Sequence, residues 1–394
     1  MRWMICSIVA CLLAISSDVS ASHGGIVCIS CHRGAAGFNA VTEGCTVCHQ
    51  GHDRIFSHAM ATRNGERQFV QRSYARFDSA FWEKNCDGCH IRQCRDCHGR
   101  GGEISKPSVG DCQVCHTGYF TGWDYSGRAP REDHMRYQRG VAVNGETFLK
   151  MLPDVHYTRG MTCGACHSMA SLAAGRKSSK GCRDCHRPSL RPVEHRIKAH
   201  MERMECFACH SAWGAQEYGT FFLRFRDRRM KDDFDLKPGR NEEYLKSAYL
   251  KSQDAPPLGI NSRGMVSPIR PMFVAYYTDI VSARNSGPEN IILAAEWRAW
   301  FPHTVQRGTV TCEACHDSPR RFLLEPERDR IYQLKRDDMK RESFWDQDGQ
   351  RVANGRFMLP GHFARINAKS PAYARGTIEK WKTLINRVET SSSP

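Results

Sequence analysis

The chain has 394 residues, of which 57 are Lys or Arg and 42 are Asp or Glu, so its formal net charge is +15. It also contains 20 Cys, 32 Gly and 17 Pro, a polar and loop-rich composition that does not support one ordinary large hydrophobic core. The basic excess would usually suggest nucleic acid or an anionic membrane as partner. The sequence has no recognisable nucleic-acid-binding motif, and we exclude that class.

Residues 1–21 are predicted to form a signal peptide. Arg2 precedes an apolar run over residues 3–15, and Val19-Ser20-Ala21 is a small-residue cleavage pattern. An alternative is lipoprotein processing at Cys11, which would leave apolar residues stranded on the mature chain. No later apolar stretch approaches the roughly 20 residues that span a bilayer. We therefore expect an exported chain that is periplasmic or carried to the outer surface, with peripheral membrane contact at most.

The sequence Cys-x-x-Cys-His occurs nine times. It is the attachment signature of c-type haem, because two thiols add to the vinyl groups of one porphyrin and the adjacent imidazole binds the iron. A lone Cys-x-x-Cys pair could equally form a zinc site, a disulfide or a thiol redox pair. Here every pair is followed by His, and the motifs use 18 of the 20 cysteines, which favours nine covalent haem c groups. The predicted attachment residues are Cys28, Cys31, Cys45, Cys48, Cys86, Cys89, Cys94, Cys97, Cys112, Cys115, Cys163, Cys166, Cys182, Cys185, Cys206, Cys209, Cys312 and Cys315.

Histidines supply the predicted axial ligands. The proximal ligands are those of the motifs, His32, His49, His90, His98, His116, His167, His186, His210 and His316. Nine other histidines match the number of haems and are the distal candidates: His23, His52, His58, His134, His156, His195, His200, His303 and His362. Four of these stand just upstream of a motif, a placement suited to ligating an adjacent iron; His303 before Cys312 is one. Met is the competing sixth ligand, and a lone His is also often an ordinary surface residue.

The spacing of the motifs predicts three blocks after the signal peptide. Residues 22–124 form a five-haem block, residues 125–215 a three-haem block, and residues 216–394 a haem-poor segment with the ninth haem. Only three residues separate His90 from Cys94, so two porphyrins must lie almost in contact. Similar short phrases recur around several motifs, which indicates an internally repetitive haem-binding array.

The haem-poor segment carries three further signals. Aromatic and basic residues are mixed over residues 218–229, which we interpret as a scaffold whose arginines meet haem propionates; a docking face or anion pocket is the alternative. Residues 273–277 and 291–300, with Asn285-Ser286-Gly287-Pro288 between them, predict a β-hairpin. Apolar side chains at helical spacing over residues 376–388 predict an amphipathic helix that docks on the body or contacts a membrane.

The predicted fold class is a multihaem cytochrome c, with mostly irregular loops and short α-helices wrapped around a haem array and a small β-hairpin segment near residues 270–300. The porphyrins would supply much of the buried apolar surface. Thioether links would restrict the unfolded chain as other cross-links do. The two propionates of each haem would offset much of the basic excess.

With these motifs the chain resembles the periplasmic and outer-surface multihaem cytochromes c of anaerobic, metal-respiring bacteria, here in a nonahaem form. The motif likeness covers residues 28–316. A finer likeness lies in Pro302-His303-Thr304 before the last motif, with Pro319 following it. The resemblance implies electron transfer in anaerobic respiration.

Three functions are consistent with these patterns. The favoured one is an electron carrier with six-coordinate haems. Its redox partners would be a quinol-oxidising membrane module and other cytochromes or an outer-membrane conduit. The first alternative is an oxidoreductase that reduces a small oxyanion of nitrogen, sulfur or selenium at one open iron. All nine motifs end in His rather than Lys, and no catalytic residue is identified, which disfavours that class. The second alternative is a subunit of an extracellular conductive filament.

Overall fold

The structure is a computed structural model, and it describes residues 45, 49–86, 90–99, 104–116, 123–125, 139–143, 146–150, 153–175, 179–227, 237–238, 243–253, 256–282, 284–289, 291–308, 310–330 and 346–391. The predicted signal peptide, the first motif, Cys48, Cys89, His23 and His134 lie outside these residues. The chain divides into two compact units. Unit 1 takes residues 1–63, 90–115 and 163–179, and unit 2 takes residues 64–89, 116–162 and 180–394. Each unit combines segments that are distant in sequence, so the units do not follow the sequential order of the predicted blocks.

Unit 1 is built from short helices. They are η1 (His52–Ser57), α4 (Ala59–Thr62), α7 (Arg95–His98), α8 (Val109–Gln113), η4 (Cys163–Ala165) and α10 (Met169–Ala174). Helices of this length are not stable alone, so contacts between segments must hold them. Ile91 N–H donates to the Met60 carbonyl at 3.0 Å, and the His58 ring contacts the Ala173 carbonyl at 2.6 Å.

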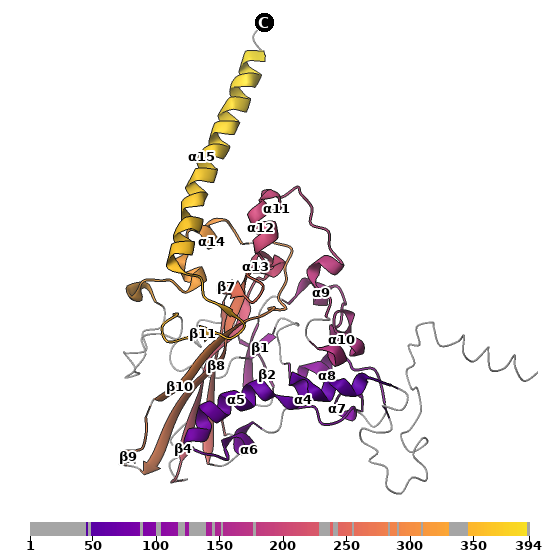
Figure 1. Ribbon diagram of the computed structural model, residues 1–394, viewed down its shortest axis with the longest axis vertical. Coiled ribbons are helices and arrows are strands. Elements are labelled where there is room, and N and C mark those ends of the chain that lie inside the picture. Colours follow the sequence, from indigo (N-terminus) through magenta and orange to yellow (C-terminus); the bar gives the residue numbers. More distant parts are fainter. Residues whose placement is uncertain are drawn as a thin grey trace, which may run out of the picture. The chain divides into compact units, whose positions relative to one another are not determined.

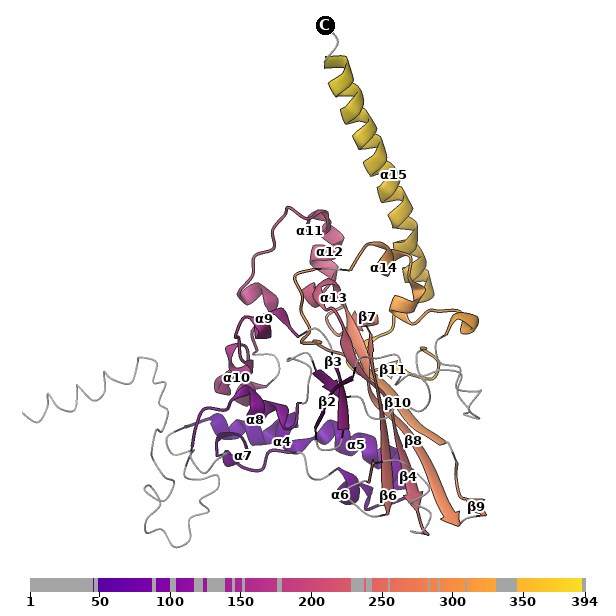
Figure 2. The same ribbon diagram turned by 180° about the vertical axis from the view of Figure 1, so that it is seen from behind.

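Unit 2 contains a nine-stranded sheet in its described part, shown in Figures 1 and 2. Its strands are β4 (Gly214–Phe225), β5 (Lys237–Pro238), β6 (Tyr244–Gln253), β7 (Leu258–Asn261), β8 (Val266–Ser282), β9 (Asn285–Ser286), β10 (Ile291–Ala299), β11 (Arg351–Val352) and β12 (Gly355–Arg356). The main order is β11-β10-β8-β4-β6-β5, and β7 and β9 also pair with β8. Strands β4 and β8 run parallel, whereas β8 and β10 run antiparallel.

The other elements of unit 2 are a small sheet and a set of helices. Strands β1 (Trp123–Tyr125), β2 (Arg139–Val143) and β3 (Glu146–Lys150) form the sheet in the order β1-β3-β2. The helices are α5 (Asn64–Arg72), η2 (Tyr74–Arg76), α6 (Phe81–Asn85), α9 (Val155–Thr158), η6 (Cys182–Asp184), α11 (Val193–Arg196), α12 (Lys198–Arg203), α13 (Cys206–His210), α14 (Glu313–His316), η8 (Pro319–Phe322), η9 (Glu327–Asp329) and α15 (Pro360–Ser391).

The predicted hairpin corresponds to β8 and β10, which pair from Ile291 opposite Tyr277 to Ala299 opposite Ile269. The expectation of a small β segment needs correction, because these strands belong to the larger sheet that begins at Gly214. The sequence around β4 gave no clear strand pattern. The strand is held by β6 and β8, which come later in the chain, so its pairing is not visible in the local sequence. The predicted helix at residues 376–388 lies within α15.

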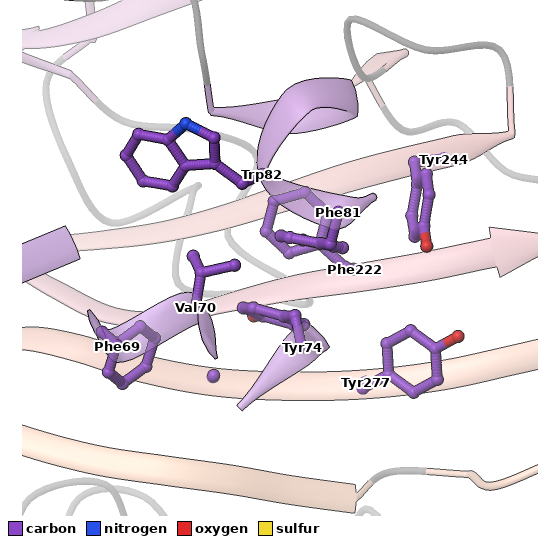
Figure 3. Close-up of a cluster of buried hydrophobic side chains, with 9 residues drawn as sticks. Phe69, Val70, Tyr74, Phe81, Trp82, Phe222, Tyr244 and Tyr277 are labelled. Carbon is purple, nitrogen blue, oxygen red and sulfur yellow. The ribbon is translucent and has the colours of Figure 1, made fainter. Parts of the chain in front are cut away.

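A buried aromatic cluster joins α5, η2 and α6 to the sheet (Figure 3). Phe81 is fully buried and stacks on Tyr74, with ring centroids 4.2 Å apart. Phe222 of β4 meets both rings edge-on, at 5.0 Å from Tyr74 and 4.8 Å from Phe81. Edge-to-face and offset-stacked contacts are the preferred arrangements of aromatic pairs. The cluster therefore fixes the segment before the third motif on the sheet of unit 2.

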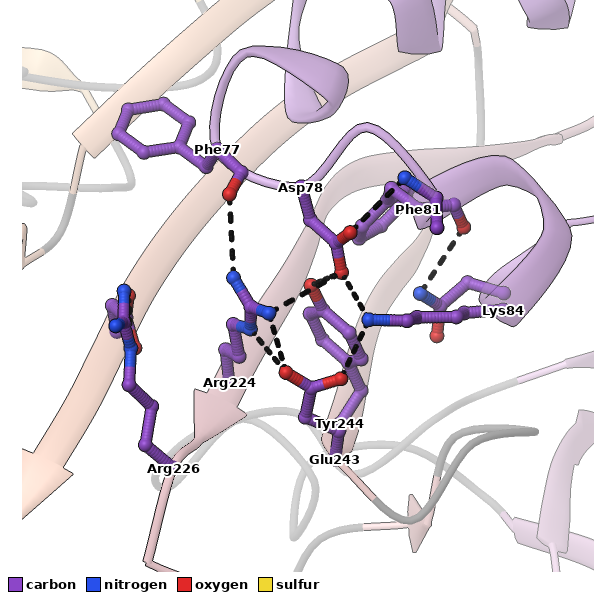
Figure 4. A network of polar contacts seen from close by, with 11 residues as sticks. Phe77, Asp78, Phe81, Lys84, Arg224, Arg226, Glu243 and Tyr244 are labelled. Carbon is purple, nitrogen blue, oxygen red and sulfur yellow. Dashed lines mark hydrogen bonds and ion pairs between the residues drawn. The ribbon is translucent and has the colours of Figure 1, made fainter.

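Beside this cluster, Figure 4 shows a network of charged side chains. Asp78 accepts hydrogen bonds from Lys84 at 2.8 Å and from the Tyr244 hydroxyl at 2.7 Å. Glu243 accepts from Lys84 at 2.7 Å and from Arg224 at 2.6 Å. The guanidinium of Arg224 is thus paired with a carboxylate. Both charge signs are matched, as partly buried ionic groups require.

The same pattern bears on the aromatic and basic run, which we interpreted as a scaffold with arginines on haem propionates and, as the alternative, as a docking face or anion pocket. Arg226 donates to Asp279 at 2.8 Å, and Arg224 is held by Glu243. Within the described part of this run, the two arginines therefore neutralise protein carboxylates and do not form an open anion site. Arg228 and Arg229 lie outside the described residues.

The ionisation of Asp78 predicts a loss of stability in acid. Burial by itself would raise the pKa of Asp78, but hydrogen bonds from Lys84 and Tyr244 outweigh it and lower the pKa below its ordinary value of 3.8. A lowered folded-state pKa stabilises the protein above the unfolded pKa, and this contribution is lost as the pH falls through the folded value. We expect the wild type to lose more free energy of unfolding than Asp78→Asn between about pH 5 and about pH 3.

Urea unfolding at the two pH values measures this difference. The matched control is Asp329→Asn, because the Asp329 side chain is 58% exposed and faces only Arg328 at 3.7 Å. This control should follow the wild type. If Asp78→Asn and wild type lost equal stability, the ionised network would not be the cause.

Candidate functional site

Most of the motifs that the structure describes form one helical turn. The motif His N–H donates to the carbonyl of the first Cys in five of them, His49 to Cys45, His98 to Cys94, His167 to Cys163, His186 to Cys182 and His316 to Cys312, at 2.8 to 3.0 Å. Residues i, i+3 and i+4 of a helix share one face. This turn therefore directs both thiols and the imidazole toward a single planar group.

Cysteines of different motifs lie against one another. In unit 1, Cys94 contacts Cys45 and Cys112 contacts Cys163; in unit 2, Cys182 contacts Cys206 and Cys209 lies near Cys315. None of the described cysteines forms a disulfide. Because each sulfur would be bonded to a porphyrin rim, apposed cysteines place two rims side by side. That arrangement suits electron transfer between neighbouring haems.

The hydrogen bond between Cys182 and Cys206 changes their acidity in opposite directions. It raises the pKa of Cys182, which donates, and lowers that of Cys206, which accepts. The two thiols are therefore close enough to interact, which places the seventh and eighth motifs side by side.

Three pairs of histidines in unit 2 are spaced for two axial bonds to one metal. The ring centroids are 5.9 Å apart for His156 and His186, 6.1 Å for His195 and His210, and 6.1 Å for His200 and His316. A metal–imidazole bond is about 2 Å long, so two rings on opposite sides of one metal have centroids about 6 Å apart. We name these the seventh, eighth and ninth sites, after their motifs. The residues present fit haem with two histidine ligands at all three.

In four of these six histidines the other ring nitrogen is anchored. His195 Nδ1 lies 2.7 Å from the Ser189 carbonyl, and His316 Nδ1 lies 2.8 Å from the Ile366 carbonyl. His210 Nδ1 lies 3.3 Å from the Gln306 carbonyl, and His156 Nδ1 lies 2.8 Å from an oxygen of Asp154. A carbonyl accepts only from an N–H, so Nδ1 carries the proton and Nε2 is left to bind a metal.

Burial also favours the metal-binding form of His200. Removal from water lowers its pKa, and the neighbouring His316 lowers it further. The neutral imidazole is the form that binds a metal. The ninth site therefore presents an unprotonated distal ligand.

The structure does not pair each distal histidine with the motif that follows it in the sequence. His156 precedes Cys163 but faces His186, and His200 precedes Cys206 but faces His316. The reason is the extended residue Ile197 between α11 and α12, which directs His195 and His200 to different motifs. His303 is likewise not the partner of His316. Its ring lies edge-on against Phe301, with centroids 4.6 Å apart.

The remaining candidates are placed differently. His52 lies 5.8 Å from His49, but three residues extend at most about 11 Å, too little to pass around a porphyrin to its far face. His52 is therefore suited to a neighbouring haem. His58 contacts the Ala173 carbonyl, and His362 lies in the first turn of α15. Their roles as ligands stay predictions.

The segment 302–306, which carried the finer likeness, connects two sites. Thr304 is fully buried, and its hydroxyl donates to the Trp213 carbonyl. The Val305 N–H donates to Asp154 at 2.7 Å, and the Gln306 N–H donates to the His210 carbonyl at 2.8 Å. The segment therefore braces the distal ligand of the seventh site against the proximal ligand of the eighth.

A second buried hydrophobic cluster packs residues of the eighth and ninth motifs together. Ala208 of α13 packs with Leu258, Ile260, Phe322 and Met358, and Cys315, Phe363 and Ile366 pack against them. A separate open pocket of about 470 Å³ is lined by His186, His195, Arg183, Arg187, Pro188, Leu190 and Met201. Its two histidines belong to the seventh and eighth sites.

Two buried charged residues near the sites, Asp154 and Arg321, were not predicted from the sequence. Asp154 is 1% exposed and holds His156; its position two residues before a candidate ligand was an available signal. Arg321 is 4% exposed and lies beside Cys209 and Cys315. Nothing in the basic sequence around it distinguishes Arg321, because its environment is made by distant segments.

Two further properties concern the described residues alone. No group of three or more His, Cys, Asp or Glu side chains converges there as a metal-ion site. No helix in that part of the chain combines the length and the apolar character needed to span a membrane.

Comparison with known proteins finds one informative similarity. The chain is 21% identical over 174 residues to the dissimilatory sulfite reductase MccA of Wolinella succinogenes. The match covers 34% of this chain and 24% of the reductase, so it spans about a quarter of that protein. No family model matches the chain, and no solved structure matches it. Together with the repeated motifs, the partial similarity supports a multihaem cytochrome with oxidoreductase chemistry.

Proposed function

We propose that this protein is a periplasmic or outer-surface nonahaem cytochrome c that carries electrons through its haem array in anaerobic respiration. The observation that carries the proposal is the set of three histidine pairs with centroids 5.9 to 6.1 Å apart. Two histidines on one iron fill both axial positions and leave none for a substrate. Each bound haem would supply one-electron redox chemistry.

The protein's own residues hold and orient these groups. The motif cysteines fix the porphyrins, and the carbonyls of Ser189, Gln306 and Ile366 fix the imidazole rings. Apposed cysteines bring the seventh site next to the eighth and the eighth next to the ninth. The partners of such an array would be a quinol-oxidising membrane module at one end and other cytochromes or an outer-membrane conduit at the other.

The intact mass of the exported protein tests the haem count. We expect a chain cut near Ala21 that carries nine covalent haem increments, because all nine motifs contain both cysteines and the histidine. Pairwise Cys→Ala replacement in one motif, Cys312 with Cys315, should remove one increment and serves as the internal standard. A mass with far fewer increments, or an intact leader, would contradict the proposal.

The second candidate function is reduction of a small sulfur or nitrogen oxyanion. It is favoured by the similarity to a sulfite reductase, which covers 34% of the chain. The histidine pairs argue against substrate binding at the three sites of unit 2, because direct substrate binding needs an open iron.

Turnover assays separate the two functions. We expect rapid reduction of the protein by low-potential donors, but slow and unsaturable reduction of sulfite, nitrite, hydroxylamine, tetrathionate or selenite. The same assay with haem-free buffer and with free haem gives the background. Saturable turnover in the ordinary enzymatic range of about 1 to 10³ per second would favour the reductase.

A further inference from the structure

Arg321 is a buried cation without a carboxylate partner in the described part of the chain. Its side chain donates to the Ala208 carbonyl at 3.1 Å and also hydrogen-bonds the sulfur of Cys315, and Cys209 lies nearby. These partners are neutral. Arginine stays charged in proteins, and burying such a charge without an anion is costly. Thioethers carry no negative charge, so Cys209 and Cys315 would not neutralise Arg321, and its positive charge lies at the contact between the eighth and ninth sites.

Asp154 is the opposite case at the seventh site. It is 1% exposed, and one oxygen accepts from the His156 backbone N–H and from His156 Nδ1, both at 2.8 Å. The other oxygen accepts from the Val305 N–H at 2.7 Å. Three N–H groups therefore converge on the two oxygens of this buried carboxyl group. A carboxylate on the second nitrogen of a ligating histidine raises the basicity of that ligand.

We propose that Asp154 and Arg321 create a step in reduction potential, so that electrons move from the seventh site toward the eighth and ninth. This inference rests on the haem attachment proposed above and adds the direction of electron transfer between the sites. A more basic ligand stabilises the ferric ion and lowers the potential of the seventh haem. A buried positive charge stabilises the ferrous ion and raises the potentials of the other two. Each transfer moves one electron, with one iron oxidised and the next reduced, and no bond is broken.

The contacts between sites give this step a route. Cys182 of the seventh site touches Cys206 of the eighth, and Cys209 of the eighth lies near Cys315 of the ninth. The three sites are therefore connected in sequence through cysteines at adjoining porphyrin rims. Arg321 lies at the second of these junctions.

Potentiometric titration of the holoprotein, followed by visible absorbance, tests the proposal. With Arg321→Gln we expect the reduced-to-oxidised ratio of two haems at fixed potential to fall about tenfold, a shift of about 59 mV for a one-electron couple. With Asp154→Asn the ratio of one haem should rise by a similar factor. The matched controls are Arg330→Gln, since Arg330 lies 3.6 Å from Asp346, and Asp279→Asn, whose carboxylate pairs with Arg226. Both controls should stay within twofold of wild type.

Intact mass is measured on every variant, so that haem loss and a change of potential are distinguished. A full haem complement with titration curves equal to those of the controls would overturn the potential step and leave the haem proposal standing. Haem missing from these sites in the wild type would overturn the proposed function itself. If Arg321→Gln does not assemble, Arg321→Met keeps the apolar packing and removes the same charge. The wild-type curve is a test that needs no variant: it must be broader than one one-electron couple, and a fit to a single potential would refute the step.

Discussion

Replacing His200 with Ala is expected to convert one haem of the assembled protein into a high-spin, carbon-monoxide-binding form. His200 faces the proximal ligand His316 with ring centroids 6.1 Å apart, and loss of an axial imidazole opens the iron of the ninth site. About one ninth of the haem should bind carbon monoxide, and the rest should stay low-spin. Visible and electron paramagnetic resonance spectra of the ferric protein, with carbon monoxide titration of the reduced form, measure this fraction.

The matched control is His303→Ala. Sequence position alone assigned His303 to the haem of Cys312, whereas the structure places its ring against Phe301. We therefore expect His303→Ala to leave the haem of the ninth site six-coordinate. An open iron at this site in His303→Ala, with wholly low-spin His200→Ala, would show that the local rule was right and the pairing in the structure wrong.

The Phe81→Ala variant is expected to lose about 3 to 5 kcal/mol of unfolding free energy, the usual result of truncating a fully buried Phe. Phe81 has no exposed surface, and besides Tyr74 it contacts Phe222 at 4.8 Å and Tyr244 at 5.3 Å. The resulting cavity would lie between α6 and the sheet. Urea unfolding followed by far-ultraviolet circular dichroism should show a lower midpoint with an unchanged slope.

Phe77→Ala provides the comparison. Phe77 is 37% exposed and stacks on Tyr277 with centroids 4.8 Å apart, so its truncation removes one ring contact and leaves no closed cavity. We expect a loss of about 1 kcal/mol. Equal losses for the two variants would mean that the aromatic cluster is not a tightly packed core.

The local geometry of the proposed haem attachment could be predicted from the sequence because all the parts of a motif lie within five residues. One helical turn brings two thiols and an imidazole to one face, and the His316 to Cys312 hydrogen bond shows this turn directly. The strands β8 and β10 were also recognisable, because they are rich in β-branched and aromatic residues and a segment with a Gly-Pro turn separates them. These features depend on contacts between near neighbours, which residue patterns record.

Contacts between segments far apart in the sequence could not be predicted from local residue patterns. Sequence order suggested that each upstream histidine serves the next motif, but His200 reaches His316 across more than a hundred residues of chain. Strand β4 finds its partners in β6 and β8, so its mixed aromatic and basic residues gave no clear strand pattern. The sequence suggested haem propionates or a bound anion as the partners of Arg224 and Arg226, whereas the structure pairs them with Glu243 and Asp279.

The sequence by itself therefore supplied the nine motifs and the atoms to which we propose that haem is attached. Only the tertiary structure decided which histidine faces which motif and where the buried charges of Asp154 and Arg321 act. The physical reason is that thioether and proximal-ligand geometry is fixed within one turn of backbone. Distal ligation and electrostatics instead depend on burial and on packing between segments far apart in the chain, which a local pattern does not encode.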